Sequence, residues 1–307
     1  MRTGLALLVT ILCVYPARAG HHTDNGHQPT FRGGVDLTTF GVTVTDRKGV
    51  IVTGLTKDDF EVVEDGKVQS LQYFAAGEGD TAPEMHVGLM VDASGSMLAD
   101  MKLAQGAAIK FLNLLPDAQD ITLVDFDTQV RVTRYPQRDF PRLVERIRQR
   151  KPDGWTALYD ALGTYLDGAG EQDGRTVLVM FTDGGDTRSA ITLSETVNLI
   201  KASDITVYAI GLVDNTGSAR QHLQMTLRQL VDASGGQAFF PTAMKDVEAA
   251  YEKVLAEIRG QYHLDYLPSN TTADGAWRKV DIKVKRPDLR VRARKGYFAP
   301  YTPSGKS

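Results

Sequence analysis

The chain has 307 residues, of which 42% are hydrophobic, and a formal net charge of -3. That length suffices for one large domain, or for one domain and a small module. The slight excess of acidic residues argues against general nucleic-acid binding, so we predict no nucleic-acid partner.

The N-terminal residues predict export. Arg2 precedes an apolar run at residues 5–15, and Ala17, Arg18 and Ala19 form a cleavage site of small residues. This pattern is typical of a secretory signal peptide, and the run is too short for a membrane span, which needs about 20 apolar residues. No later apolar run approaches that length. We therefore expect no transmembrane segment and a mature chain that is periplasmic or secreted.

Cleavage of the predicted signal peptide, residues 1–19, also removes the single cysteine, Cys13. The mature chain then has no disulfide, and its 33 basic and 38 acidic residues give a net charge of -5. Residues 20–30 are polar and rich in glycine and histidine. That composition predicts a disordered leader.

Two segments at opposite ends of the mature chain alternate between apolar and polar residues, which predicts antiparallel strands. In residues 31–80, Asp65 and Gly66 separate two strand-like runs, a strong hairpin signal. Residues 261–302 contain two strands around a turn at Pro287 and Asp288. We expect the two segments to pair and to form one small antiparallel β module.

Residues 84–260 alternate between strand and helix patterns. Short, continuously apolar runs predict buried parallel strands at residues 86–91, 121–126, 176–181 and 205–212. Helical patterns occur at residues 97–115, 142–150, 157–169, 193–202, 222–233 and 245–259. This alternation predicts an α/β fold with a doubly wound, mostly parallel sheet, inserted in the small antiparallel β module.

The pentapeptide VDASG occurs twice, and the first copy marks a candidate site. It follows an apolar strand and continues to a further serine, which gives the series Asp92, Ser94 and Ser96. These side chains offer one carboxylate and two hydroxyls at the carboxyl end of a parallel strand. Ligands bind at such ends in doubly wound sheets.

The second copy, at residues 231–235, has a different context. Its preceding leucines recur at helical spacing, so this copy ends a helix instead of a strand. Gly235 and Gly236 stand where a left-handed helix cap belongs. We predict a structural role for this copy.

Two other segments complete the candidate site. Thr156 stands just before a helix, and Asp183 stands just past the end of a parallel strand. Hydroxyl and carboxylate oxygens suit Mg²⁺, Mn²⁺ or Ca²⁺ rather than zinc. Neutral hydroxyls leave most of the cation's charge available to an incoming carboxylate. A helix beginning near Met97 would strengthen that attraction.

Together, Asp92-x-Ser94-x-Ser96, Thr156 and Asp183 resemble the metal-ion-dependent adhesion site of von Willebrand factor A domains. The flanking strand segments resemble a group of exported bacterial proteins called von Willebrand factor A-related. The resemblance implies that the serines bind the metal directly, the threonine directly or through water, and the aspartates partly through water. It also implies a protein-binding module whose partner presents an acidic residue.

An enzymatic alternative uses Asp125 and Asp127, which end an apolar strand much as in the aspartyl-phosphate loop of haloacid-dehalogenase phosphatases. Gln129 stands where that family needs Thr or Val, and a turn residue is the simpler interpretation of Asp127. The sequence has no P-loop and no nucleophile elbow. His86 lies roughly 20 Å upstream of Asp92 along the strand, too far to act as a base. We expect no enzymatic activity, and keep a divalent-metal phosphohydrolase and a structural envelope protein with a stabilising metal as alternatives.

The C-terminal segment is basic. Alternation would place six basic side chains on one face of the two strands around Pro287: Lys279, Lys283, Lys285, Arg290, Arg292 and Arg294. Such a face could contact a polyanion. A solvated face, or a sheet edge protected by charge, is the alternative interpretation.

Overall fold

In a computed structural model, the described part of the chain comprises residues 37–77, 82–115, 117–169, 172, 174–212, 218–242 and 244–302. The predicted signal peptide (residues 1–19) and leader (residues 20–30) lie outside it. Within the described part, every helix is too short or too polar to cross a membrane.

One six-stranded sheet forms the α/β domain, in the order β10-β9-β8-β5-β6-β7. All its neighbouring strands pair in parallel except β7, which is antiparallel to β6. The strands are β5 Met85–Asp92, β6 Ala118–Phe126, β7 Val130–Pro136, β8 Arg175–Thr182, β9 Thr206–Gly211 and β10 Ala238–Phe239. The doubly wound, mostly parallel sheet predicted from the sequence is confirmed.

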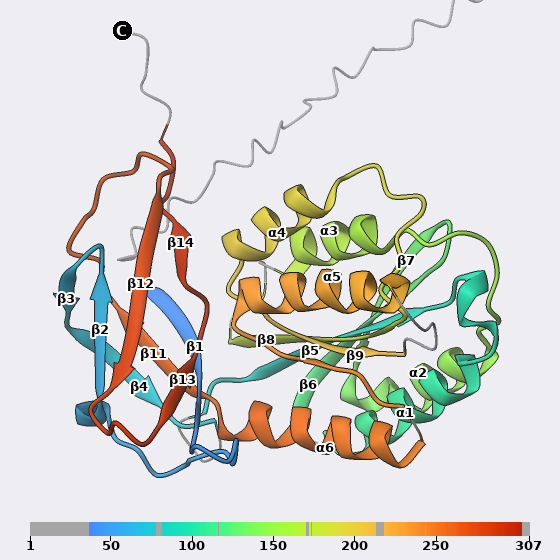
Figure 1. Cartoon of the computed structure of the whole chain (residues 1–307), viewed down its shortest axis with the longest axis horizontal. Coiled ribbons are helices and arrows are strands. Elements are labelled where there is room, and N and C mark those ends of the chain that lie inside the picture. Colours follow the sequence, from blue (N-terminus) through green and yellow to red (C-terminus); the bar gives the residue numbers. More distant parts are fainter. Residues whose placement is uncertain are drawn as a thin grey trace, which may run out of the picture. The chain divides into compact units, whose positions relative to one another are not determined.

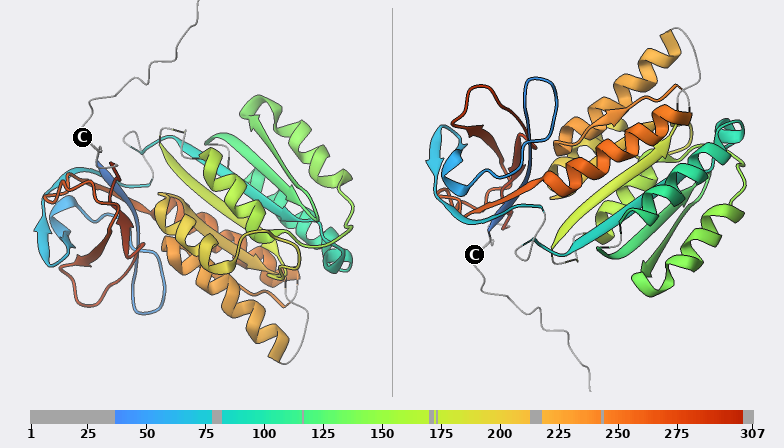
Figure 2. Two further views of the ribbon diagram at one scale, coloured as in Figure 1. Left: turned by 90° about the horizontal axis from the view of Figure 1, so that it is seen from above. Right: turned by 90° about the horizontal axis from the view of Figure 1, so that it is seen from below.

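Helices cover both faces of this sheet (Figures 1 and 2). Helices α1, α2 and α6 pack on one face, and α3, α4 and α5 pack on the other. Burial of both faces explains why every residue of β5 is buried. The helices are α1 Met101–Asn113, α2 Phe140–Gln149, α3 Leu158–Ala169, α4 Leu193–Ala202, α5 Ser218–Ser234 and α6 Met244–Gly260. The described residues also include three short 3-10 helices: η1 Lys57–Asp59, η2 Gly95–Leu98 and η3 Gln137–Asp139.

The predicted start of the first helix near Met97 is wrong. After β5 the chain forms the 3-10 turn η2, and α1 begins only at Met101, with Asp100 as its N-cap. Met97 is fully buried in the core between the sheet and α1, which fixes the turn before the helix begins. The N-terminus of α1, which carries the positive end of the helix dipole, therefore lies at Met101 and not at Ser96. The dipole of α1 thus does not support cation or anion binding at the candidate site in the way the sequence predicted.

Two four-stranded antiparallel sheets form the β module, in the orders β13-β1-β11-β4 and β14-β12-β2-β3. Strand β1 pairs with β11, and β2 pairs with β12, so strands from both ends of the chain pair as predicted. Their inner faces share one apolar core that includes Phe40, Val62, Tyr262 and Ile282. The strands are β1 Thr38–Thr45, β2 Phe60–Glu64, β3 Lys67–Gln69, β4 Leu71–Ala75, β11 Tyr262–Tyr266, β12 Trp277–Val284, β13 Arg290–Arg292 and β14 Gly296–Phe298.

The predicted hairpin at Asp65 and Gly66 is confirmed. It joins β2 to β3, with Glu64 paired to Lys67. Asp65 has φ 46° and Gly66 has φ 85°. A two-residue hairpin loop with positive φ at both positions matches the right-handed twist of its strands.

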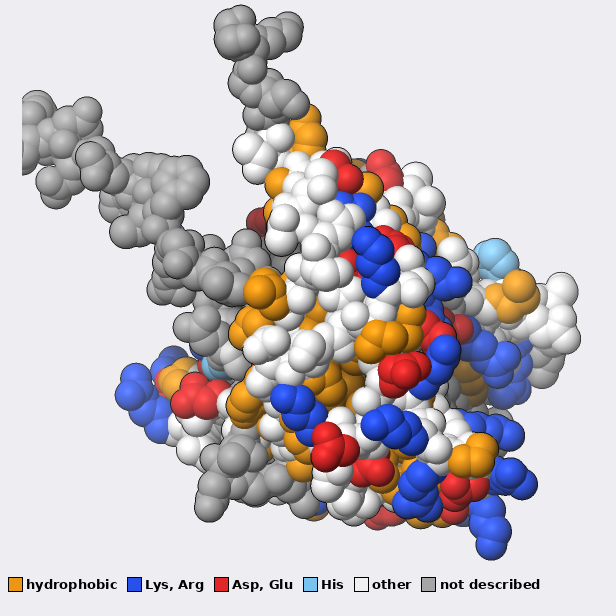
Figure 3. Space-filling model, turned by 90° about the vertical axis from the view of Figure 1, so that its left-hand side faces the viewer, with side chains coloured by type: hydrophobic (Ala, Val, Ile, Leu, Met, Phe, Trp, Pro, Cys, Tyr) orange, Lys and Arg blue, Asp and Glu red, His pale blue; other side chains and the backbone are white. Residues whose placement is uncertain are grey.

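The predicted basic face of the C-terminal segment is wrong. Strands β12 and β13 belong to different sheets, so they do not form a hairpin with a common face. Arg292 forms an ion pair with Glu257, and Arg294, which is 6% exposed, forms one with Asp204. On the face drawn in Figure 3, Lys and Arg side chains lie among Asp and Glu side chains.

Candidate metal centre

The candidate centre lies where three loops meet at the carboxyl edge of the parallel sheet. Strands β5 and β8 are neighbours, with Val91 paired to Phe181. Asp92 ends β5, and Asp183 directly follows β8. The two aspartates therefore leave the sheet side by side, as the sequence predicts for ligands at a strand end.

The first loop brings two hydroxyls together. Asp92 is fully buried, and its Oδ1 accepts a hydrogen bond of 2.9 Å from the backbone N–H of Ser94. Ser94 Oγ lies 2.9 Å from Ser96 Oγ. Ser94 is buried, whereas Ser96 is exposed. The pair thus leads from the buried carboxylate to the protein surface.

The second loop, which carries Thr156, is tied to the first by backbone hydrogen bonds. Gly95 N–H donates to the carbonyl of Gly154 over 3.0 Å. Gly154 has φ +72°, and a Cβ atom there would lie 2.4 Å from Thr128 Oγ1. Glycine is therefore needed at position 154 for the close approach of this loop to Thr128. Thr156, two residues further on, is buried beside the first loop.

The third loop follows Asp183 and holds Thr156 from its other side. Thr156 N–H donates to Thr187 Oγ1 over 3.0 Å, and the carbonyl of Thr156 accepts from Thr187 N–H over 2.9 Å. Asp183, which is half-buried, accepts a 2.9 Å hydrogen bond from Gly185 N–H. The structure thus brings together the three segments that the sequence singled out.

Electrostatics favour a cation at this position. Burial raises the pKa of Asp92 to about 6, and repulsion by Asp183 adds to that rise. Hydrogen bonds from Ser94 and Thr182 only partly offset it. A bound cation would favour the charged form of Asp92.

Sequence reasoning missed Thr182. Its Oγ1 donates to Asp92 Oδ2 over 2.6 Å and accepts from Gly184 N–H over 3.1 Å. Thr182 is fully buried, so it fixes the second oxygen of Asp92 in place. The only sequence signal was a hydroxyl residue directly before Asp183 at a strand end.

The donor set fits a hard divalent cation. Two carboxylates and three hydroxyls offer oxygen only, as Mg²⁺, Mn²⁺ and Ca²⁺ prefer. Among the described residues, no group of three or more His, Cys, Asp or Glu side chains is placed to hold a metal ion. A centre built on hydroxyls is compatible with that finding, because only two of its five residues belong to those types.

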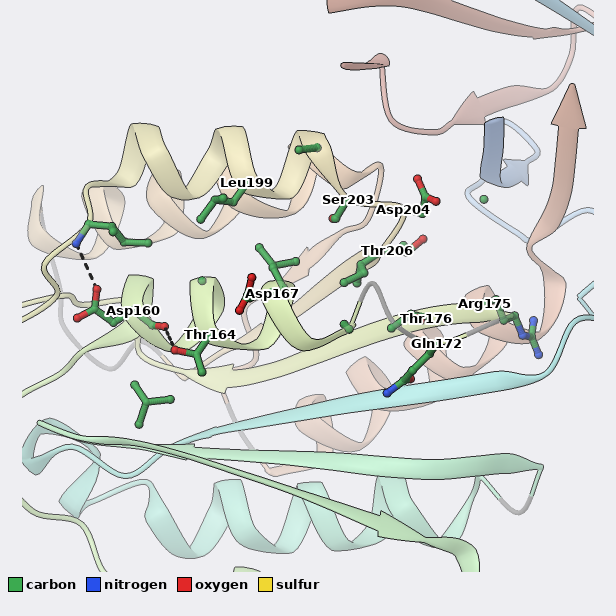
Figure 4. Close-up of a pocket in the computed structure, with 18 of the residues that line it drawn as sticks. Asp160, Thr164, Asp167, Gln172, Arg175, Thr176, Leu199, Ser203, Asp204 and Thr206 are labelled. Atoms are coloured by element: carbon green, nitrogen blue, oxygen red, sulfur yellow. Dashed lines mark hydrogen bonds between the residues drawn. The ribbon is translucent and has the colours of Figure 1, made fainter. Parts of the chain in front are cut away.

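A cavity of about 1090 Å³, lined by residues of the α/β domain and by Thr39, Gly41 and His263 of the β module, does not include the candidate centre (Figure 4). Asp160, Thr164 and Asp167 of α3 line this cavity, as do Arg175 and Thr176 of β8. None of the five predicted metal ligands lines it. The centre instead reaches the surface at Ser96, an arrangement that suits a partner surface better than an enclosed substrate.

The carboxylates of the phosphohydrolase alternative are held by arginines. Asp125 Oδ2 lies 3.1 Å from Arg146 Nη2, and Asp125 Oδ1 lies 3.1 Å from Arg150 Nε. Asp127 lies in the turn between β6 and β7. It accepts a 2.7 Å hydrogen bond from Gln129 N–H and forms an ion pair with Arg150. Burial alone would raise the pKa of Asp127, but these hydrogen bonds hold it below its usual value. Asp127 is a turn residue, as predicted.

The second VDASG copy is structural, as predicted. Helix α5 ends at Ser234, and Gly235 follows with φ 78°. Gly236 N–H donates to the carbonyl of Val231 over 3.0 Å, as in a left-handed helix cap. Ser234 Oγ accepts from Val207 N–H over 2.9 Å, so it is committed to packing.

The three histidines within the described residues also lie away from the centre. His86 Nδ1 lies 3.0 Å from Asp120 Oδ2, near the start of β5 and therefore at the opposite end from Asp92. His222 is exposed on α5, and His263 is buried in β11. None of the three is placed to act as a base at Ser94.

Comparison with known proteins agrees with this geometry. The family model for the von Willebrand factor type A domain matches residues 87–185, a range that includes all five predicted ligands. The comparison with curated proteins found no match.

Solved structures of similar fold include a pilus adhesin, SpaC from Lactobacillus rhamnosus GG. It has a TM-score of 0.50 and 9% identity over 81% of this chain and 49% of that chain. A von Willebrand factor type A protein from Catenulispora acidiphila has a TM-score of 0.48 and 14% identity over 89% and 76%. The PilB minor pilin from Streptococcus sanguinis has a TM-score of 0.46 and 15% identity over 60% of this chain and 63% of its own. The chain thus spans less than two thirds of that pilin and about half of the adhesin. Within the α/β domain, residues 87–185 thus match the von Willebrand factor type A domain.

Proposed function

We propose that the protein is an exported, non-enzymatic binding module of the adhesion type that depends on a divalent cation. Asp92, Ser94, Ser96, Thr156 and Asp183 would hold Mg²⁺, or Mn²⁺ or Ca²⁺ in its place. One observation carries the proposal: a fully buried Asp92 beside Asp183, at the inner end of two hydroxyls 2.9 Å apart that reach the surface.

The bound cation would supply an electrostatic attraction for the acidic side chain of a protein partner. Three of its five ligands are neutral hydroxyls, and the two carboxylates bring the formal charge of the site to zero. The cation would therefore still attract a further carboxylate. The protein's own residues orient the centre: Thr182 and Ser94 N–H fix Asp92, and the carbonyl of Gly154 accepts a hydrogen bond from Gly95 N–H of the first loop. The fold is shared with a pilus adhesin, a role compatible with this proposal.

The alternatives differ in what they require. A phosphohydrolase would need Asp125 and Asp127 free to bind metal and phosphate, but arginines already hold both. A purely structural metal would raise stability, by about 2.7 kcal/mol at a hundredfold excess of metal over its Kd, without affecting any partner. Partner binding that requires the metal therefore separates the proposal from the second alternative.

Calorimetric titration with Mg²⁺ and Mn²⁺ tests the centre directly. Asp92→Ala should reduce metal affinity by at least about tenfold more than Ser96→Ala, because it removes an ionic contact as well as geometry. Asp167→Ala, which removes an exposed carboxylate of α3, is the matched control and should leave affinity unchanged.

Two outcomes would contradict the proposal. Equal metal binding by the wild type and Asp92→Ala would mean that the centre is misassigned. Metal-dependent phosphatase turnover that is lost in Asp127→Ala but kept in Asp92→Ala would establish the phosphohydrolase instead.

A further inference from the structure

Two large apolar side chains stand in solvent on the loops of the candidate centre. Trp155, which directly precedes Thr156, is 64% exposed, and Leu98, two residues after Ser96, is 74% exposed. Adjacent Cα atoms lie about 3.8 Å apart, and two residues of a 3-10 helix rise only about 4 Å. The Cα atoms of these two residues therefore lie close to those of Thr156 and Ser96, and we call the two residues the rim of the centre.

Neither side chain is needed for the core. In the turn η2, Met97 fills the core while its neighbour Leu98 faces solvent. On the second loop, Thr156, Ala157 and Leu158 are buried directly after the exposed Trp155. An exposed tryptophan on a loop is uncommon, and tryptophan is the residue type most enriched among the energetic anchors of interfaces.

The backbone presents both residues rigidly. Trp155 N–H donates to Thr128 Oγ1 over 2.9 Å, and the carbonyl of Gly154 accepts from Gly95 N–H over 3.0 Å. The turn that carries Leu98 is closed by a 3.1 Å hydrogen bond from Met97 N–H to the carbonyl of Ser94. Anchors fixed in this way lose little conformational freedom when a partner binds.

Charge at the same rim favours an acidic partner segment. Arg188 is exposed, and its backbone N–H donates to the carbonyl of Thr156 over 3.0 Å, which places the backbone of Arg188 beside Thr156. A guanidinium there would attract the same kind of segment as the cation.

We propose that the partner segment carries a large apolar residue next to the acidic residue that reaches the cation, and that this apolar residue packs against Trp155 and Leu98. The inference rests on the proposed function, because the cation supplies the first contact. A strongly hydrated carboxylate gives little affinity alone. Burial of one neighbouring leucine or phenylalanine side chain should add about ten- to a hundredfold.

Paired synthetic peptides with saturating Mn²⁺ test this inference. Both members of a pair contain one acidic residue, which is flanked by leucine or phenylalanine in one member and by glycine in the other. The proteins are the wild type, Trp155→Ala, Leu98→Ala, the conservative Trp155→Phe, and Val68→Ala as the control. Val68 is a matched control because it is an apolar side chain of β3 that is 68% exposed.

The wild type should bind the apolar member at least about tenfold more tightly than the glycine member. Trp155→Ala and Leu98→Ala should lose most of this preference, whereas Trp155→Phe and Val68→Ala should keep it. All five proteins should bind Mn²⁺ alike. If Trp155→Ala loses Mn²⁺, Trp155 supports the loop itself, and Leu98→Ala then decides the inference.

Failure of the inference differs from failure of the proposed function. Metal-dependent binding with no preference for the apolar member, or a preference that survives both alanine variants, overturns the inference and leaves the metal centre intact. No Mn²⁺-dependent binding of any peptide overturns the inference together with the proposed acidic partner. No Mn²⁺ binding by the wild type refutes the centre itself.

Discussion

Residue spacing predicted the five candidate ligands because each stands at the end of a strand or the start of a helix. The structure joins their three loops through backbone hydrogen bonds such as that from Gly95 to Gly154. Thr182 could not be predicted in this way. Its role depends on the pairing of β5 with β8, which places its hydroxyl 2.6 Å from Asp92 Oδ2.

Thr182→Val should weaken the centre and the fold together. The substitution removes the donor to a buried carboxylate, which should lower the free energy of unfolding by about 1–3 kcal/mol. It should also weaken Mg²⁺ binding, because Asp92 is then less well oriented. Urea unfolding and calorimetric titration measure the two effects.

Thr196→Val is the matched control for this prediction. Thr196 is fully buried in α4, and its Oγ1 donates to the carbonyl of Thr192 over 2.9 Å, away from the centre. The Thr196→Val variant should have a lower free energy of unfolding than the wild type and the same Mg²⁺ affinity. Unchanged Mg²⁺ affinity in Thr182→Val would refute the orienting role of Thr182.

At the scale of elements, continuous apolar runs predicted the parallel strands well because both faces of that sheet are buried. Alternation was less informative in the C-terminal segment. It identifies which residues of a strand face the core, but it does not say to which of two sheets the strand belongs. Residues 285–289 therefore connect β12 to β13 across the module, where the sequence predicted a hairpin.

Strand β11 carries a buried histidine that should make stability depend on pH. Burial lowers the pKa of His263 from 6.5 to about 3, and repulsion by Arg175 adds to that effect. The unfolded chain takes up this proton below about pH 6.5, whereas the folded protein does not until about pH 3. His263 therefore does not reduce the free energy of unfolding above pH 6.5. As the pH falls from 6.5 towards 3, protonation of this histidine in the unfolded chain lowers the free energy of unfolding progressively.

Urea unfolding between pH 7.5 and pH 5 of the wild type and His263→Gln measures this contribution. Over the 1.5 units below pH 6.5, the wild type should lose roughly 2 kcal/mol more than the variant, at about 1.4 kcal/mol per unit. Buried carboxylates with raised pKa values, such as Asp92 and Glu257, act in the opposite direction but are common to both proteins. Equal pH dependence of the two proteins would show that His263 is not kept neutral by the fold.

At the scale of the whole molecule, the sequence pattern changes from apolar–polar alternation to alternating strands and helices and then back again. This change predicted that the α/β domain is inserted in the β module. The proposed segment boundaries, at residues 31–80, 84–260 and 261–302, stay predictions. The contacts that join the two parts were not predictable from composition. Arg292 and Arg294 looked like a basic surface, yet they pair with Glu257 of α6 and Asp204 before β9.

The same limit applies to function. The sequence supplied the oxygen donors of the centre, whereas the rim of Trp155 and Leu98 became visible only from their exposure in the folded chain. Residue type alone does not distinguish an exposed tryptophan from a core residue. The fold therefore adds the surroundings of the proposed cation to the ligands that the sequence predicts.

The most direct test of the central claim is a crystal structure with bound Mn²⁺ and a map of its anomalous scattering. We expect one strong peak in contact with the hydroxyl oxygens of Ser94 and Ser96, at about 2.1 Å, and close to Thr156, Asp92 and Asp183. A peak beside Asp125 and Asp127, or in the cavity beside Asp160 and Asp167, with none at the two serines, would contradict it.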